Sequence, residues 1–372
     1  MKSHTFRIES LTPIYIGGNS DKNWQENIDY IYRAGKIYIM DIAKIARSLT
    51  PLELSRWSAA LLNRDDSFFN QFFSNRKLSD YALISYPSET RPRDVIRAFS
   101  RNGLGQAFIP GSSVKGAIRS MLIAELFTGQ PITKQADIDA LFGNISNNLM
   151  HYIQVSDVII EPGDLELTMS KIFNLHRQGE WKGGWKHGGS IGTTNDFDPN
   201  KFTTAYETIY PEKMLGDRLH LLINEKLFQY HQNQLDRHDN KHPVPPHFSK
   251  LFGTSTDPVA TLFRIINKHI KKQLIKEKEF YRTYEVEETD YIVDYLDDIV
   301  HQITDDGESC VLRIGQGSGY YGITGDWKFK DHLTTIGVPS FGKHYKSRKW
   351  SFVYQDDELY LSPFGFIKLN KE

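Results

Sequence analysis

The stretch IPGSSVKGAIR, residues 109–119, constrains this chain more than any other. An apolar strand end runs into Pro-Gly, two serines and an amphipathic helix. Ser112 or Ser113 is expected to cap that helix by accepting a backbone N–H bond in its first turn. The exposed N–H groups and the helix dipole attract an anion to such a helix start. Lys115 and Arg119, four residues apart, share a helix face beside it, so the segment is predicted to bind phosphate.

A nucleoside triphosphate is the first candidate for that phosphate, and the spacing argues against it. Gly111 and Gly116 have the separation of a Walker loop, in which Lys and Ser or Thr follow the second glycine. Ala117 and Ile118 stand there instead. A plain strand–turn–helix junction, with glycine for the turn and serine for the cap, explains the same residues. The local sequence leaves both a phosphate-binding helix start and this plain junction open.

Length and composition predict a soluble chain of two domains. Its 372 residues are 39% hydrophobic and 24% charged, and domains usually have roughly 100–200 residues. The single cysteine, Cys310, excludes an intramolecular disulfide and a cysteine-based zinc site, and favours a reducing compartment. No apolar run approaches the roughly 18 residues of a membrane span, and the first ten residues lack the apolar core of a signal peptide. We expect a cytoplasmic protein without a membrane partner.

The net charge of −1 conceals segregated runs of charge. Residues 91–119 hold six basic residues against one acidic residue, and 264–282 hold seven against two. Residues 285–306 hold nine acidic residues and no Lys or Arg. Such segregation suits a subunit that meets a polyanion on one face and basic partners on another. A solvated helix face is the plainer explanation for each run, and we prefer it for the acidic one.

Apolar periodicity predicts an α+β chain without regular βαβ spacing. Helices are expected over 41–47, 51–63 and 112–127, and strands over 6–12, 107–109, 152–160 and 165–173, with a hairpin over 30–40. A basic helix starting at Asp257-Pro258 and an acidic helix over 292–303 are expected to form an antiparallel pair. Late strands are expected over 310–314, 350–354, 359–361 and 364–369.

Composition also suggests boundaries and loops. The sequence predicts a second unit that begins near Glu161, and so domains 1–160 and 161–372, the second with a helical insertion at about 257–306. Residues 179–198 contain six glycines and no periodic apolar pattern, so we predict a flexible loop there. That loop carries Trp181 and Trp185 beside Lys182 and Lys186. Tryptophans beside lysines could stack on nucleic-acid bases, although a disordered insertion explains the same residues.

The motif at 111–119, with its preceding apolar strand, resembles a signature of the RAMP proteins of CRISPR systems. The opening residues 8–18, the pair of segments 141–143 and 155–157, and the strands over 207–223 resemble other parts of that family. Residues 313–320, RIGQGSGY, resemble its C-terminal glycine-rich loop, although 321–327 are unlike what usually follows. Length and order are most similar to the fifth Csm subunits of type III-A effector complexes.

This resemblance implies fold, activity and partners. It implies tandem ferredoxin-like (RRM-like) domains with helical insertions, and a non-catalytic subunit that caps the backbone filament at the 3′ end of the CRISPR RNA. The implied partners are that RNA, the neighbouring Csm backbone subunits and the small subunit, with the target RNA as a further candidate, and no cofactor or metal is implied. With the basic and aromatic residues noted above, the predicted RNA-binding residues are Arg93, Arg97, Gly111, Ser112, Ser113, Lys115, Arg119, Trp181, Lys182, Lys186, Gly315, Gly317, Ser318, Gly319 and Tyr320.

Glycine, lysine and arginine suit that role physically. Phosphate contacts position a nucleic acid without reading its sequence. Without Cβ atoms, Gly315, Gly317 and Gly319 let successive N–H groups approach a phosphate or form an anion nest. A hairpin turn would use the same glycines.

No catalytic group is predicted. His238, His242 and His247 have ligand-like spacing but no Cys or paired carboxylate nearby. Asp21 is a weak candidate for a target-cutting aspartate, and Cys310 is expected to be a buried apolar residue.

Three alternatives stay open at the sequence level. A Cas6-like processing endoribonuclease on the same fold would use groups such as Tyr320, Tyr321 or His332. A RAMP subunit of a type III-B (Cmr) complex would share most of the motifs. A pure protein scaffold would bind no RNA.

Overall fold

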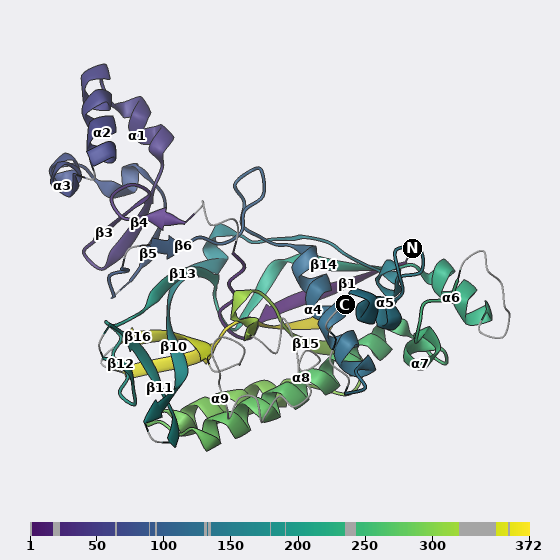
Figure 1. Cartoon of the computed structure of the whole chain (residues 1–372). Helices are drawn as coiled ribbons and strands as arrows, with labels where there is room; N and C mark the ends of the chain where they lie inside the picture. The colour runs from purple at the N-terminus through teal and green to yellow at the C-terminus, as the bar shows by residue number, and fades with distance from the viewer. Residues whose placement is uncertain are drawn as a thin grey trace.

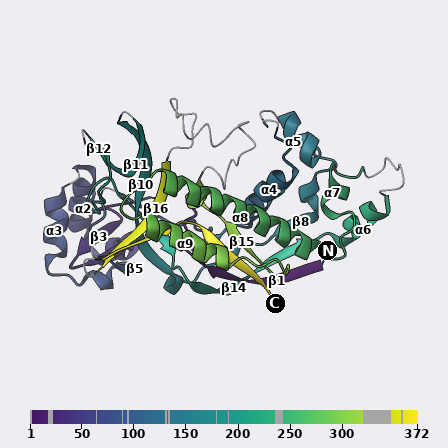
Figure 2. The same cartoon turned by 90° about the horizontal axis from the view of Figure 1, so that it is seen from below.

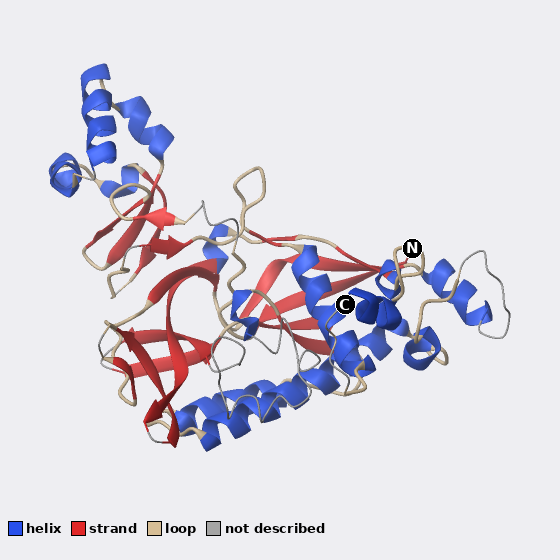
Figure 3. Ribbon diagram, in the orientation of Figure 1, coloured by secondary structure: helices blue, strands red, loops and turns tan. Residues whose placement is uncertain are grey.

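Helices and strands mix along the whole chain, which confirms the α+β class (Figure 3). The computed structural model describes residues 2–17, 23–63, 65–88, 90–93, 95–129, 132, 135–178, 180–189, 191–234, 243–319, 347–355 and 358–372. Within these ranges, no helix combines the length and the apolar composition needed to cross a membrane.

A five-stranded antiparallel sheet carries the larger core. Its order is β15 (Ser309–Arg313), β18 (Phe366–Lys371), β1 (Lys2–Ser10), β14 (Lys213–Ile223) and β8 (Ile153–Val155). Phe6 and Ile8 of β1 are fully buried, whereas Arg7 between them is exposed. Because side chains alternate along a strand, the sheet has one apolar and one polar face. Helices α4 (Gly111–Leu126) and α8 (Pro258–Thr283) pack on the apolar face, where the rings of Phe6 and Phe263 lie 5.2 Å apart.

Helices α8 and α9 (Thr289–His301) run side by side, as the sequence predicts (Figures 1 and 2). Asp257 caps α8 by accepting the N–H groups of Val259 and Ala260, both at 3.0 Å. Only a short turn separates the two helices, so they pack antiparallel. Lys278 of α8 pairs with Asp297 of α9, which joins the basic and acidic runs seen in the sequence.

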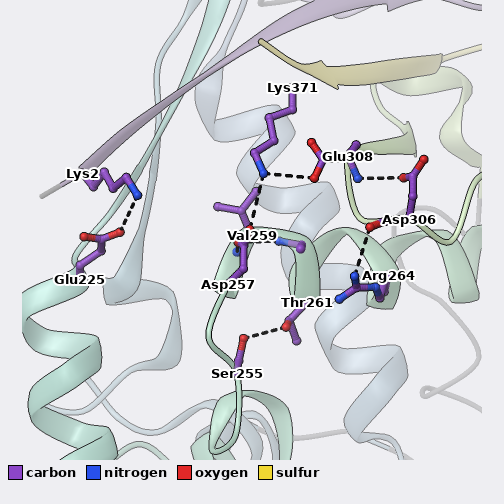
Figure 4. Close-up of polar contacts among 11 residues, drawn as sticks. Lys2, Glu225, Ser255, Asp257, Val259, Thr261, Arg264, Asp306, Glu308 and Lys371 are labelled. Atoms are coloured by element: carbon purple, nitrogen blue, oxygen red, sulfur yellow. Dashed lines mark hydrogen bonds and ion pairs between the residues drawn. The ribbon is translucent and has the colours of Figure 1, made fainter.

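Helix α8 also closes an open edge of the sheet. The side-chain amide of Asn267 donates to the carbonyl oxygen of Ser309 at 2.9 Å, and its oxygen accepts the N–H of Val311 at 2.9 Å. These are backbone groups of edge strand β15, which an amide side chain can satisfy in place of another strand. At the start of α8, Lys371 of β18 reaches both Asp257 and Glu308 (Figure 4), so the last strand is tied to this helix.

A second sheet has the order β12–β11–β10–β13–β6–β2, and β16 pairs with β10 and with β17. The bounds are β2 (Trp24–Gln25), β6 (Val95–Arg97), β10 (Leu165–Gln178), β11 (Glu180–Gly188), β12 (Gly192–Thr194), β13 (Thr204–Ile209), β16 (Ser347–Gln355) and β17 (Glu358–Pro363). Both large sheets therefore draw strands from either side of the predicted boundary at residues 160/161.

A lobe with its own core projects from the body of the molecule (upper left in Figure 1). A sheet of β3 (Tyr30–Arg33), β4 (Lys36–Met40) and β5 (Ala82–Pro87) carries helices α1 (Ile42–Ser48), α2 (Pro51–Asn63) and α3 (Asp66–Ser74). Their shared core comprises Ile31, Met40, Ile45, Trp57, Ala60, Phe69, Phe73 and Leu78. The hairpin and two of the helices match the sequence prediction, but the separate core was not foreseen.

Two sequence expectations about elements are wrong. Residues 179–198 hold strands β11 and β12 rather than a flexible loop, because the glycines permit close packing. A Cβ on Gly183 would lie 2.3 Å from the carbonyl oxygen of Tyr284, and one on Gly184 would lie 2.5 Å from that of Thr194. The single strand expected over 152–160 is divided into β8 and β9 (Val158–Ile159), since the chain turns at Ser156 and Asp157.

The remaining elements are short. They are β7 (Phe108–Ile109), which pairs with β9, the helices α5 (Gln135–Phe142), α6 (Glu225–Gln234) and α7 (Phe248–Phe252), and the 3-10 helices η2 (Leu78–Asp80), η3 (Leu149–Tyr152), η4 (Pro162–Asp164) and η5 (Gln316–Ser318).

Candidate nucleic-acid interface

The start of α4 is capped by a residue remote in sequence rather than by the serines of the helix itself. Pro110 occupies the cap position without a side-chain hydrogen bond, and its carbonyl oxygen accepts the N–H of Ser113 at 2.9 Å. Ser112 and Ser113 lie inside the first turn, so the predicted serine cap is wrong. Instead, the Oδ1 of Asp157 accepts the N–H of Gly111 at 2.7 Å.

Gly111 allows that contact. A Cβ at this position would lie 2.2 Å from the carbonyl oxygen of Val155 and 2.7 Å from that of Ser156. The turn before β9 therefore presses against the helix start and delivers the carboxylate of Asp157. An anion at a helix N-terminus is stabilising, and here the protein supplies one. The predicted phosphate site thus already holds a negative group at its first N–H.

Lys115 and Arg119 are both half-buried on α4. Burial lowers the pKa of the Lys115 ammonium. The guanidinium of Arg119 lies 5.3 Å from the ring centroid of Phe142, at the end of α5, within the range of a cation–π contact. The guanidinium of Arg119 therefore lies beside a fully buried ring.

The glycine loop, residues 315–319, packs on the segment that follows β1. Gly315 has a φ of 76°, and a Cβ there would lie 2.2 Å from the carbonyl oxygen of Tyr15. Gln316 donates its N–H to that same oxygen at 3.1 Å. The buried hydroxyl of Ser318 donates to the carbonyl oxygen of Gly315 at 2.6 Å, and Gly319 has a φ of 65°. Of the predicted loop residues, Gly317 lies within η5, and Tyr320 lies outside the described residues.

Two cations lie around the tyrosines beneath this loop. The rings of Tyr15 and Tyr206 are 4.6 Å apart. Arg97 of β6 is in register with Tyr206 of β13. Burial raises the pKa of Tyr15 to about 12, and the charge of Arg97 acts in the opposite direction. The ammonium of Lys349 contacts the hydroxyl of Tyr206 and lies 4.7 Å from its ring centroid. We call residues 315–319, the half-buried cations Arg97 and Lys349, and the buried tyrosines Tyr15 and Tyr206 together the glycine-loop surface.

A buried carboxylate fixes the strand that presents Arg97. Glu207 of β13 is fully buried and forms an ion pair with Arg101 at 2.6 Å. It also accepts the hydroxyl of Tyr86 at 2.5 Å and the N–H of Phe99 at 2.8 Å. These bonds hold the chain on both sides of β6 against β13. Glu207 is thus a positioning residue for the surface.

The RNA-binding residues predicted within 179–198 do not belong to the glycine-loop surface. Trp185 is fully buried, and its Nε1 donates to Glu288 at 2.9 Å, just before α9. Lys186 lies 4.2 Å from the ring centroid of Phe202. Trp181 is half-buried and Lys182 is exposed on the same strand, which packs against the turn between α8 and α9. Base stacking by Trp185 is therefore wrong, because its ring lies in the core.

The remaining candidate residues add no binding or catalytic group to the glycine-loop surface within the described part of the chain. Arg93 is exposed in the segment before β6. Among the described residues, no cluster of His, Cys, Asp or Glu is arranged to hold a metal ion. Cys310 is fully buried as predicted, and burial raises the pKa of its thiol. The other sequence candidates, Asp21, His238, His242, Tyr321 and His332, lie outside the described residues.

Sequence reasoning missed Tyr15, Tyr206 and Lys349. The signal for Tyr15 was its place in the segment after the first strand, which resembles the family loop. Lys349 gave no such signal, because it joins the surface only through the pairing of β16 with β10.

A family model described as the RAMP superfamily matches residues 7–320. The chain belongs to this superfamily. Two curated relatives are both described as "CRISPR system Cms protein Csm5". The Streptococcus thermophilus protein is 30% identical over 138 residues, 32% of this chain and 38% of the relative. The Methanocaldococcus jannaschii protein is 24% identical over 198 residues, 46% of each chain. The matched part thus spans less than half the length of either relative.

Solved structures share the fold over nearly the whole chain. A chain of a Csm–crRNA–target RNA ternary complex of a type III-A CRISPR-Cas system has a TM-score of 0.65 at 16% identity, covering 98% of this chain and all of that one. The crystal structure of T. onnurineus Csm5 has a TM-score of 0.62 at 14% identity, covering 97% and 99%. These two structures therefore share the fold of this RAMP protein.

Proposed function

We propose that this RAMP protein is a non-catalytic CRISPR RNA-binding and assembly subunit of a type III-A Csm effector complex. It caps the backbone filament at the 3′ end of the CRISPR RNA and meets the neighbouring Csm subunits there, with the target RNA as a further partner. The observation that carries the proposal is the glycine-loop surface, where a tight glycine turn, Arg97 and Lys349 come together from distant parts of the chain.

The surface suits a phosphate backbone better than a base sequence. Arg97 and Lys349, both half-buried, supply positive charge beside the tight turn at Gly315. Contacts of this kind bind any sequence. A subunit that holds a guide RNA needs that indifference, because the guide sequence varies.

The finer fold description is also a proposal. The five-stranded sheet with α4 and α8 on one face has the layers of a ferredoxin-like domain, which supports one such unit, built from strands on both sides of residue 160. The division into 1–160 and 161–372, with an insertion at about 257–306, stays a prediction. Limited proteolysis tests it: two fragments that meet near residue 160 and separate in solution support the division, and fragments that stay associated contradict it.

An RNA titration tests the RNA-binding role. The double variant Arg97→Ala/Lys349→Ala should bind single-stranded RNA of any sequence more weakly, and the slope of log affinity against log salt should fall by about 0.7 for each lost phosphate contact. Lys44→Ala/Arg47→Ala, two exposed cations of α1, is the matched control. Equal affinity and slope in both variants would contradict the proposal. Metal-independent cleavage of repeat RNA would support the endoribonuclease alternative instead.

The 3′-end position needs the assembled complex. Reconstituted complexes carrying CRISPR RNA with one photoreactive nucleotide, placed near either end, should cross-link this subunit only from the 3′ portion. Cross-links from the 5′ portion alone would remove the capping role while leaving RNA binding intact.

A further inference from the structure

A pocket of about 180 Å³ opens beside the glycine loop, between the α8–α9 pair and β16. Its apolar lining is drawn from α8, α9, β10, β16 and β17: Leu274, Tyr281, Leu296, Ile172, Trp350 and Pro363. Leu274, Tyr281, Leu296 and Trp350 are at most 3% exposed. Gln316 and Gly319 of the glycine loop also line it, and Gln316 is exposed. The open side of the pocket therefore faces the glycine-loop surface.

A buried ion pair supplies polar groups inside the pocket. Arg348 and Glu277 both line it, and both are more than nine-tenths buried. The Nε of Arg348 donates to Glu277 at 2.9 Å, and the guanidinium carbon lies 3.1 Å from the ring centroid of Phe280. The two charges cancel each other. The interior of the pocket therefore carries polar atoms but no net charge.

Two partly exposed cations also line the pocket. Arg313 and Lys349 line the pocket and are half-buried, and Lys349 also belongs to the glycine-loop surface. A ligand that matches this arrangement has an anionic group outside and a neutral, planar ring with polar edges inside. A nucleotide of single-stranded RNA has that form, because a base can leave the stack while its phosphate stays on the surface.

The volume of the pocket also limits the size of the ligand. Pockets for drug-sized molecules have roughly 300–1,000 Å³, so about 180 Å³ suits one ring system. We propose that this pocket holds a single unstacked base of the RNA bound at the glycine loop. The inference rests on the proposed RNA-binding function and adds where one base goes.

Photo-cross-linking tests it on the full chain. Single-stranded RNAs, each with one 5-iodouridine at a successive position, are bound, irradiated, digested and mapped by mass spectrometry. One position should cross-link to the peptide of Tyr281 or Trp350. Leu296→Phe fills the pocket and should reduce that cross-link about tenfold. Ile275→Phe adds the same ring on the exposed side of α8 and should leave it unchanged.

A change in the RNA tests the same proposal without altering the protein, so the result does not depend on whether a variant folds. An abasic nucleotide at the cross-linking position should weaken binding to the unmodified protein by about tenfold, since one held base contributes roughly that much, and should have little effect with Leu296→Phe. RNA that binds without any cross-link to the pocket overturns the inference and leaves the proposed function standing. Failure to bind RNA at all overturns both. If Leu296→Phe binds RNA normally but no longer joins the neighbouring subunits, the pocket holds a protein side chain and the inference is wrong.

Discussion

The two cations of α4 decide whether the GSSVKG segment touches RNA or only shapes the fold. Asp157 already bonds the first N–H of that helix, so any phosphate there must be held mainly by Lys115 and Arg119. Lys115→Ala/Arg119→Ala should weaken RNA binding equally for all sequences and lower the salt slope by about 0.7 per lost contact. A filter-binding titration over several salt concentrations measures both. An unchanged slope assigns the segment a structural role alone.

Loss of the Glu207 carboxylate should strongly destabilise the protein. Glu207→Ala leaves Arg101, the Tyr86 hydroxyl and the Phe99 N–H without their buried partner. Removing one member of a buried ion pair costs about 3–5 kcal/mol, so the free energy of unfolding in urea should fall by that order. Arg91→Ala breaks an exposed pair with Glu26 and should cost less than about 1 kcal/mol. Similar losses in both variants would refute the role given to Glu207.

Glu166 makes the stability of the protein depend on pH. Burial raises its pKa to about 7, against the hydroxyl bonds of Thr168 and Thr208. Between the ordinary value of 4.5 and about 7, the folded state holds a proton that the unfolded state has lost, so stability falls as pH rises through that window. Glu166→Gln should remove this fall and be more stable than wild type at pH 8, by about 1–2 kcal/mol after discounting for partial exposure. Urea unfolding at pH 5, 6, 7 and 8 measures it, and parallel profiles would count against it.

At the scale of the element, alanine substitutions at the two glycines of the 111–119 motif should change the stability of the protein in opposite directions. Gly111→Ala forces a Cβ onto the carbonyl oxygen of Val155 and should cost about 3 kcal/mol or disrupt the turn. Gly116 has open space around it within the same helix. Gly116→Ala should therefore raise stability by about 0.5–1 kcal/mol, because alanine favours a helix over glycine. Thermal and urea unfolding compare the two variants. Equal effects would mean that the turn does not press on α4.

Local signals predicted the elements whose ends are set by neighbouring residues. Asp257-Pro258 predicted the start of α8 because the capping residue and its hydrogen-bond partners are adjacent in sequence. The cap of α4 was missed because Asp157 is 46 residues from Gly111, and Pro110 displaces the serines from the cap position. The strand through Trp185 was missed because glycines that permit close packing have the composition of a flexible loop. The candidate site follows the same rule: the glycines of residues 315–319 are apparent in the sequence, whereas their position near Arg97 and Lys349 depends on sheet pairing.

At the scale of the whole molecule, the order of strands separates parts that can be removed from parts that cannot. Strand β18 lies between β15 and β1 in the interior of the five-stranded sheet, although it is near the end of the sequence. The lobe helices α1–α3, in contrast, pack in a core of their own. Met40 and Ala82 are paired neighbours at the two ends of that helical segment, so a short turn can join them.

Replacing residues 41–81 with Asn-Gly should therefore leave a folded protein. Asn-Gly favours the tight turn of a β-hairpin, and Ile31→Thr with Met40→Thr makes the uncovered sheet face polar. We expect a cooperative melt and an RNA salt slope equal to that of the full chain, because the glycine-loop surface draws nothing from these helices. Truncation after Phe364 removes β18 and serves as the contrast: its product should lack a cooperative transition. A shortened chain that melts without cooperativity would show that the lobe supports the body of the molecule.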